Sequence, residues 1–311
     1  MKPTVLQLGP LLPLVEQGLA SAYNHLQLAK AADPAAFLAA NAASIDALVS
    51  TSRSGVNAAL LDSLPKVKLV AHFGVGYDNV DAEHARRKGV VVTNTPDVLT
   101  DCVADLAIAL LVDVARGVTA GDRYVRAGRW LKGPMPLATK VTGKRLGIVG
   151  LGRIGRAIAA RAEGFDMEIR YHNRRQSPDS PYPYERSLAD LARWCDFLVV
   201  ATSGGESTRG LVSASVIEAL GPEGFLVNIA RGSVVDEPAI VSALVERRIA
   251  GAALDVFADE PRVPEALLAL DNVVLTPHIA SATTDTRAAM GQLVLDNLAR
   301  FFETGQAITP V

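Results

Sequence analysis

Short apolar segments alternate with helical patterns along this chain, and that alternation limits the fold more than any other feature. Five segments among the first hundred residues have the length and composition of β-strands, at 4–9, 24–28, 47–50, 67–72 and 90–93. Intervening stretches such as 57–64 and 82–88 carry apolar residues at helical spacing. Strands that alternate with helices predict a parallel sheet with helices on both faces, which is an α/β fold.

A second series of strands and helices occupies the other half of the chain. Its expected strands lie at 146–149, 168–171, 197–201, 225–228, 252–255 and 273–275. Between the two series, apolar residues from Val103 to Val114 recur at helical spacing, which predicts a long amphipathic helix with Thr100 as its N-cap. An irregular arm rich in Gly and Pro follows at 128–144, and a closing helix is expected at 283–304. A chain of 311 residues is long enough for two domains.

A glycine-rich turn opens the second series. Gly150–Gly155 (GLGRIG) follows an apolar strand and leads into a helical segment. Gly150, Gly152 and Gly155 allow a tight turn, a close approach of the backbone to a pyrophosphate and close packing of helix on strand. Amides at the helix start then face the anion. Any tight strand–helix turn could use two such glycines, but this context favours a dinucleotide site.

The residues about 20 positions beyond the turn indicate which dinucleotide binds. NAD sites normally place an acidic residue there for the ribose 2′-hydroxyl. This chain has His172 at that position, followed by Asn173, Arg174 and Arg175. Two arginines could bind a 2′-phosphate, which a carboxylate would repel. The alternative is that these arginines only cover a solvated loop. We predict a preference for NADP(H), with NAD(H) possible.

Three polar residues follow successive strands of the second series. Arg231 comes after the strand at 225–228, Glu260 after the strand at 252–255, and His278 after the strand at 273–275. Open α/β sheets bind ligands at the carboxyl ends of their strands. An arginine can hold a carboxylate and polarise a carbonyl, and a histidine beside a carboxylate can supply a proton. Together the three residues predict a 2-keto acid reductase.

A second glycine-containing turn, Gly74–Gly76, follows the strand that ends at His72. Successive amides at such a place can form a small anion-binding nest, although a purely structural turn is an equal alternative. We interpret His72 and His84 as packing or surface residues.

Charge and cysteine content exclude several classes of protein. The net charge is −2, from 31 basic and 33 acidic residues, which gives no electrostatic footprint for nucleic acid. No apolar run reaches the roughly 18 residues of a membrane span, and the N-terminal segment lacks a signal-peptide pattern. Two cysteines are too few for a disulfide framework. We therefore expect a cytoplasmic protein with a small-molecule substrate, no nucleic-acid or membrane partner and no metal site.

Taken together, these motifs resemble the D-isomer-specific 2-hydroxyacid dehydrogenases along essentially the whole chain. Within that family the chain is most similar to the branch of glyoxylate/hydroxypyruvate reductases and hydroxyphenylpyruvate reductases, as residues 98–105 and the basic loop after Tyr171 indicate. The segments that carry the resemblance are 72–78 (HFGVGYD), 93–100 (TNTPDVLT), 150–155 (GLGRIG), 228–232 (NIARG), 255–261 (DVFADEP) and 276–278 (TPH).

The resemblance implies a Rossmann cofactor domain inserted into a flavodoxin-like substrate domain. The substrate domain would comprise residues 1–97 and 285–311, and the dinucleotide-binding domain residues 98–284. A homodimer would form through the helix and arm at 100–140.

The resemblance also implies roles for individual residues. Arg231, Glu260 and His278 would be catalytic, and the amides of Val75 and Gly76 would receive the carboxylate of a 2-keto or 2-hydroxy acid. Further cofactor contacts would come from Arg153, Ile154, Asn173, Arg174, Arg175, Thr202, Ile229 and Asp255. A different class remains open, because proteins of this fold also serve as dinucleotide-sensing corepressors.

Overall fold

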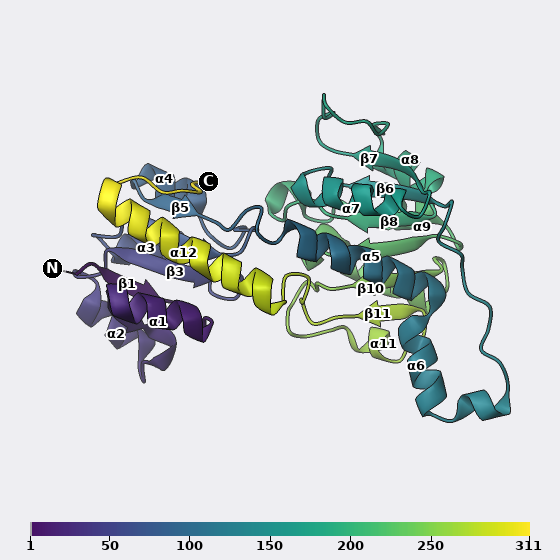
Figure 1. Cartoon of the computed structure of the whole chain (residues 1–311), viewed down its shortest axis with the longest axis horizontal. Helices are drawn as coiled ribbons and strands as arrows, with labels where there is room; N and C mark the ends of the chain where they lie inside the picture. The colour runs from purple at the N-terminus through teal and green to yellow at the C-terminus, as the bar shows by residue number, and fades with distance from the viewer. Residues whose placement is uncertain (1) are drawn as a thin grey trace. The chain divides into compact units, whose positions relative to one another are not determined.

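Two parallel β-sheets organise the chain (Figure 1). The computed structural model describes residues 2–311. Contacts divide the chain into a terminal unit, formed by the residues up to Leu99 together with Thr283–Val311, and a central unit, Thr100–Ala282. The boundaries expected from the sequence were 97/98 and 284/285. The α/β prediction is confirmed, because all strand pairs in both sheets are parallel.

The terminal unit contains a five-stranded sheet in the order β2-β1-β3-β4-β5, which is the flavodoxin order. Its strands are β1 (Thr4–Gln7), β2 (Asn24–Gln27), β3 (Ala47–Thr51), β4 (Leu69–Phe73) and β5 (Val91–Thr93). Its helices are α1 (Pro13–Ala22), η1 (Leu28–Lys30), α2 (Pro34–Asn41), α3 (Ala58–Ser63), α4 (Ala82–Arg87) and α12 (Thr284–Thr304).

Local sequence explains where these elements begin and which of them are buried. Strands β1 and β4 are buried at every residue, as expected of inner strands that helices cover on both faces. Side chains of Asp33, Asn57 and Asp81 accept backbone N–H groups and so cap α2, α3 and α4. Thr283 caps α12 in the same way, through the N–H of Thr286, which explains the start of the closing helix.

The central unit contains a six-stranded sheet in the order β11-β10-β9-β8-β6-β7. Its strands are β6 (Arg145–Val149), β7 (Glu168–His172), β8 (Phe197–Val200), β9 (Phe225–Asn228), β10 (Gly251–Leu254) and β11 (Val273–Leu275). Its helices are α5 (Thr100–Arg116), α6 (Val118–Arg126), η2 (Arg129–Lys132), α7 (Arg153–Glu163), α8 (Leu188–Trp194), η3 (Glu206–Thr208), α9 (Ala214–Leu220), η4 (Gly232–Val234), α10 (Glu237–Val245) and α11 (Glu265–Leu268).

The strand order of the central sheet reverses at β6. The chain runs from β6 to β7 on one side and then crosses to β8 on the other side of β6. Tyr184 adds a single parallel bridge to Tyr171 on the outer side of β7, which is the place of the third strand in the Rossmann order 3-2-1-4-5-6. In open α/β sheets, ligands bind at the carboxyl ends of the strands where the order reverses. That point lies at the end of β6.

The long helix begins one position earlier than predicted. Thr100 is the first residue of α5 and not the N-cap that precedes it. The helix then breaks at Gly117, whose φ of +63° lies in the left-handed region, and α6 continues in a new direction. In Figure 1, α6 and the segment after it project from the rest of the central unit. None of the helices in the described chain, residues 2–311, has the length and apolar character needed to cross a membrane.

Candidate active site

The glycine turn lies between β6 and α7, where the order of the central sheet reverses. A Cβ at Gly150 would lie 2.6 Å from the Thr202 nitrogen, and one at Gly155 would lie 2.1 Å from the Gly150 oxygen. Close packing therefore requires both glycines. A Cβ at Gly152 would meet no atom within 4 Å. Space of this kind beside the start of a helix suits the approach of a pyrophosphate to the backbone.

The loop after β7 supports the glycine turn and presents two arginines. The Asn173 Oδ1 accepts a hydrogen bond from the Leu151 N–H at 2.7 Å. Arg174 and Arg175 are exposed, and neither makes a hydrogen bond or an ion pair within residues 2–311. His172, which stands where an acidic residue would bind a ribose, stacks on Tyr184. The end of β7 therefore offers two cationic side chains and no carboxylate.

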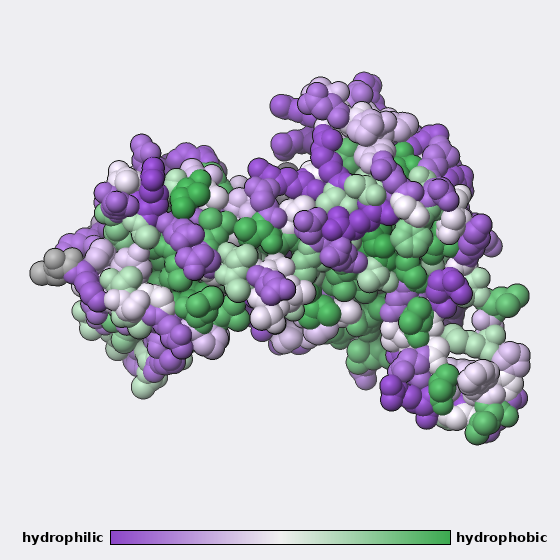
Figure 2. Space-filling view, in the orientation of Figure 1, coloured by the Kyte–Doolittle hydropathy of each residue, from purple (hydrophilic) through white to green (hydrophobic). Residues whose placement is uncertain are grey.

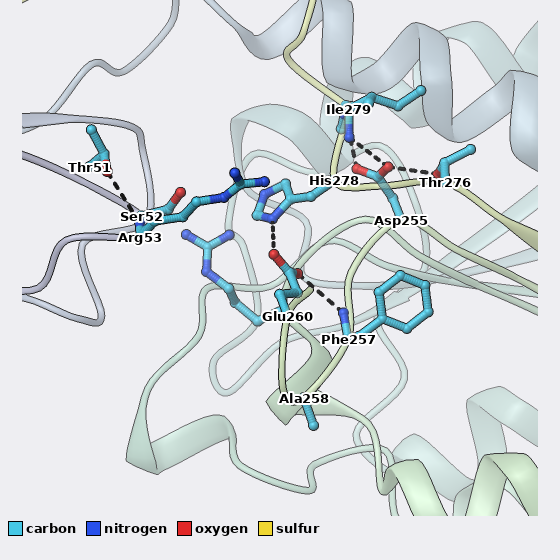
Figure 3. A network of polar contacts seen from close by, with 12 residues as sticks. Thr51, Ser52, Arg53, Asp255, Phe257, Ala258, Glu260, Thr276, His278 and Ile279 are labelled. Carbon is cyan, nitrogen blue, oxygen red and sulfur yellow. Dashed lines mark hydrogen bonds and ion pairs between the residues drawn. The ribbon is translucent and has the colours of Figure 1, made fainter. Parts of the chain in front are cut away.

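Glu260 and His278 form the centre of the candidate site (Figure 3). The His278 Nδ1 lies 2.7 Å from the Glu260 Oε2, and each side chain is 26% exposed. The other Glu260 oxygen accepts the Phe257 N–H at 3.2 Å. A histidine held by a carboxylate at one nitrogen and accessible to solvent can present its other nitrogen to a substrate.

The electrostatic environment keeps Glu260 ionised. Burial alone raises the pKa of a carboxyl group, and this is the largest single effect on Glu260. The hydrogen bond and charge of His278, the Phe257 N–H and the charge of Arg231 act in the opposite direction, and together they lower the pKa of Glu260 below its ordinary value. Glu260 is therefore a carboxylate at neutral pH. Arg231, Glu260 and His278 follow β9, β10 and β11, which are neighbours in the central sheet.

Asp255 fixes the loop that carries His278. Its carboxylate is fully buried and accepts hydrogen bonds from the Thr276 hydroxyl at 2.7 Å and from the N–H groups of Ile279 and Ala280 at 2.8 and 2.9 Å. His278 itself has a φ of +55°, a conformation that residues other than glycine rarely adopt. Such a backbone persists where surrounding contacts enforce it, and it marks sites where a side chain must point in one direction.

The loops of Arg231 and Glu260 pack directly against each other. A Cβ at Gly232 would lie 1.9 Å from the Phe257 carbonyl carbon, so only glycine fits there. The Glu237 side chain, at the start of α10, accepts the Ala258 N–H at 2.9 Å. Asn228 is buried, and its side chain bonds to the Arg231 carbonyl and the Ala230 N–H. These supporting residues were not identified from the sequence, because only the fold shows which loops they join.

The remaining predicted cofactor residues also lie at carboxyl ends of the central sheet. Arg153 and Ile154 form the first turn of α7, Thr202 follows β8, and Ile229 follows β9. Their contacts with a cofactor stay a prediction, as does the contact expected of Asp255.

Val75 and Gly76 belong to the terminal unit, in the turn after β4. The Val75 carbonyl accepts a hydrogen bond from the Asn94 side chain at 2.9 Å, and the Gly74 carbonyl accepts the Thr95 N–H at 2.9 Å. The turn is therefore held through its carbonyl groups.

Comparison with known proteins agrees with this architecture. The sequence model of the D-isomer specific 2-hydroxyacid dehydrogenase NAD binding domain matches residues 108–280. A hydroxyphenylpyruvate reductase of Plectranthus scutellarioides is 52% identical over 275 residues, which cover 88% of each chain. A glyoxylate/hydroxypyruvate reductase of Arabidopsis thaliana is 46% identical over 307 residues, 99% of this chain and 98% of the relative.

Among solved structures, an NADPH-dependent glyoxylate/hydroxypyruvate reductase from Sinorhizobium meliloti, in complex with NADP and malonate, superposes with a TM-score of 0.94. The two sequences are 44% identical, and the match includes 100% of this chain and 97% of the Sinorhizobium meliloti chain. The fold and site define a dinucleotide-dependent oxidoreductase of the α/β class. The chain belongs to the D-isomer-specific 2-hydroxyacid dehydrogenase family.

Proposed function

We propose that this protein reduces a 2-keto acid to the corresponding D-2-hydroxy acid, with glyoxylate, hydroxypyruvate or an aryl-pyruvate as substrate. The observation that carries the proposal is the 2.7 Å contact between His278 and Glu260 beside Arg231, at the carboxyl ends of three adjacent strands. The names of the relatives support the substrate class, since they include reductases of hydroxyphenylpyruvate, hydroxypyruvate and glyoxylate.

Each residue has a distinct task in this reaction. When bound, the reduced nicotinamide supplies the hydride that reaches C2 of the keto acid. His278 donates a proton to the carbonyl oxygen and becomes a neutral imidazole, so one hydride and one proton complete the alcohol. Glu260 stabilises the protonated imidazole before that transfer. Arg231 holds the carboxylate and polarises the carbonyl, and the amides of Val75 and Gly76 bind the carboxylate.

We further propose that the central unit binds NADP(H) in preference to NAD(H). Gly152 leaves space beside the start of α7, and the end of β7 carries Arg174 and Arg175 without a competing acidic residue. The turn proposed to bind the substrate carboxylate, at Val75 and Gly76, belongs to the terminal unit. The corepressor alternative has no support among the relatives named above, which are all reductases, and the intact catalytic trio also argues against it.

The proposal is tested by following NADPH oxidation with glyoxylate, hydroxypyruvate, phenylpyruvate and hydroxyphenylpyruvate. We expect turnover of at least one of them, and chiral analysis should identify the D-hydroxy acid as product. Binding of NADPH without turnover of any keto acid would support the corepressor alternative instead. We expect phenylpyruvate to be accepted, because a relative that is 52% identical is named a hydroxyphenylpyruvate reductase.

Replacement of Glu260 by Gln should change the pH dependence of the reaction. The lowered pKa of Glu260 means that a negative charge faces His278 throughout the neutral range. Gln removes that charge, so a positively charged imidazole loses its electrostatic partner. The decline of keto-acid reduction with rising pH should therefore occur at lower pH than in the parent protein. Initial rates measured between pH 5 and 9 give the two profiles.

Asp259→Asn provides the control for this comparison. Asp259 lies in the same loop, but it is exposed and pairs with Arg262 at 2.7 Å. Loss of the Asp259 carboxylate should leave the pH profile of keto-acid reduction the same as that of the parent protein. If the Glu260→Gln profile coincides with that of the parent protein, Glu260 does not serve His278.

We also propose a homodimer that forms through α5, α6 and the arm that follows. Several apolar side chains are exposed on this projecting part of the central unit, interspersed with hydrophilic ones (Figure 2, lower right). The exposed members are Val118, Val125, Trp130, Leu131, Met135 and Leu137. Leu131 and Leu137 are 94% and 103% exposed, whereas the Met135 side chain packs near Gly117. Large apolar side chains exposed together on one projection suit burial against a second copy.

A double substitution of Leu131 and Leu137 by Asp should therefore shift the protein from dimer to monomer. Light scattering coupled to gel filtration at several concentrations measures the mass. Leu268→Asp is the control, because that leucine is exposed on α11 and lies outside the arm. A parent protein with the mass of one chain would contradict the proposed dimer. We also propose the cytoplasm as the compartment, because two cysteines are too few for a disulfide framework.

A further inference from the structure

The turn after β4 is held by all three of its carbonyl groups. The Gly74 carbonyl accepts the Thr95 N–H at 2.9 Å, and the Val75 carbonyl accepts the Asn94 side-chain amide at 2.9 Å. The Gly76 carbonyl accepts a hydrogen bond from the His72 Nε2 at 3.1 Å. Three consecutive peptide groups are therefore fixed by partners that all lie within the terminal unit.

Fixing a carbonyl also fixes the direction of the neighbouring amide. In a trans peptide group the C=O and the following N–H point in opposite directions. The bond from Thr95 to Gly74 therefore orients the Val75 N–H, which has no hydrogen-bond partner within residues 2–311. The bond from Asn94 to Val75 orients the Gly76 N–H, and the bond from His72 fixes the backbone on the other side of Gly76. A preorganised amide can bind an anion without the free-energy cost of reorienting the backbone.

His72 is the only side chain among these partners that is completely buried and titratable. It is the fourth residue of β4, is 0% exposed and makes hydrogen bonds at both ring nitrogens. The Nδ1 lies 2.9 Å from the hydroxyl of Ser50, on the neighbouring strand β3, and that residue is also 0% exposed. Because a carbonyl can only accept, the Nε2 must carry the hydrogen that is donated to Gly76. Ser50 then holds the ring in that orientation.

The imidazole also lies directly beneath Gly74. A Cβ at Gly74, whose φ is +159°, would come within 3.0 Å of the His72 Nε2. The ring therefore contacts the turn at its first glycine and binds it at its last. If this position only needed to be filled, an apolar side chain of similar size would suffice. The hydrogen bond from the His72 Nε2 to the Gly76 carbonyl therefore indicates a role beyond packing.

We propose that His72 is a positioning residue that sets the geometry of the Val75 and Gly76 amides and thereby the affinity for the carboxylate of the keto acid. The proposal rests on the proposed function of that turn. His72 would act on the substrate only through its hydrogen bond to Gly76, without contacting the substrate itself. Loss of His72 should therefore weaken binding of the carboxylate while the chemistry at His278 continues.

Kinetics with an acid and its ester test this proposal. We expect His72→Phe to raise the KM for glyoxylate about tenfold, which corresponds to one lost orienting hydrogen bond, and to change kcat by less than about threefold. Methyl glyoxylate lacks the carboxylate, so its kcat/KM should change much less than that of glyoxylate. His72→Gln keeps a side-chain N–H donor and should recover much of the glyoxylate affinity. Asn94→Leu removes the hydrogen bond to the Val75 carbonyl and should likewise raise the KM for glyoxylate.

His25→Phe is the matched control, because His25 lies in β2 of the same sheet and bonds to Gln7. It should leave both substrates unaffected. Equal effects of His72→Phe on the acid and the ester, or no effect on either, would overturn the proposal. If thermal melting shows that His72→Phe does not fold, Ser50→Ala is measured in its place. A KM for glyoxylate in Ser50→Ala equal to that of the parent protein would also overturn the proposal.

A failure of the proposed function gives a different result. The parent protein would then not reduce glyoxylate at all. If only the inference about His72 fails, the parent protein is active and the variants affect glyoxylate and its methyl ester equally. Calorimetric titration with oxalate decides the inference even without turnover. We expect about tenfold weaker binding to His72→Phe than to the parent, and equal dissociation constants would contradict the role of His72.

Discussion

The His278→Asn variant is expected to reduce keto acids at least about 100-fold more slowly than the parent protein, with binding of NADPH retained. Asn fills similar space and can still hydrogen-bond to Glu260, but it cannot release a proton at neutral pH. The loss should appear in kcat and in kcat/KM alike, because proton transfer occurs only in the transition state. Single-turnover rates and a fluorescence titration with NADPH separate chemistry from cofactor binding.

A histidine outside the site controls for the substitution itself. His84 lies at the surface of the terminal unit and pairs with Asp62 at 2.8 Å. His84→Asn should retain more than half of the parent activity. A loss of less than about tenfold in His278→Asn would show that another group, or water, supplies the proton.

The second large effect is expected from Arg174→Ala combined with Arg175→Ala. Two charge-assisted contacts with a 2′-phosphate, at roughly 1.5 to 3 kcal/mol each, imply that their loss raises the KM for NADPH by at least about tenfold. Both arginines are exposed, so salt screens part of this energy, and the difference between parent and variant should shrink as ionic strength rises. The KM for NADH should change by less than about twofold, because NADH has no 2′-phosphate.

Arg193→Ala combined with Arg247→Ala removes the same charge elsewhere in the central unit. These residues form ion pairs with Asp190 and Asp271 at the surface. This control variant should keep the parent's KM values for both cofactors. A parent protein that uses NADH and NADPH with equal KM would contradict the assignment of Arg174 and Arg175 to the 2′-phosphate.

Local patterns in the sequence were sufficient for most of the fold. Alternating strand and helix segments predicted every strand of both sheets to within about two residues, because an inner parallel strand is a short apolar run with recognisable ends. The separate helix α6 was not predicted, since a glycine such as Gly117 does not by itself reveal whether the chain turns there. The third strand of the Rossmann order, reduced to one bridge at Tyr184, also left no strand-like signal.

The residue types of the candidate site were also evident from the sequence. Arg231, Glu260 and His278 each follow a strand, and parallel strands place their carboxyl ends at one edge of a sheet. The glycine turn at 150–155 and the two arginines after β7 were recognisable for the same reason, since each lies next to a strand end.

Only the tertiary structure decided how these side chains are held. Asp255 bonds to the loop of His278 across two strands, Gly232 packs against Phe257, and His72 bonds to Ser50 and Gly76. Such contacts join residues that are 4 to 25 positions apart, and the closure of the fold determines which pairs meet. The sequence by itself thus determined the chemical groups and the strand ends that carry them, because those depend on local patterns. Their orientation depended on long-range packing, which no local pattern encodes.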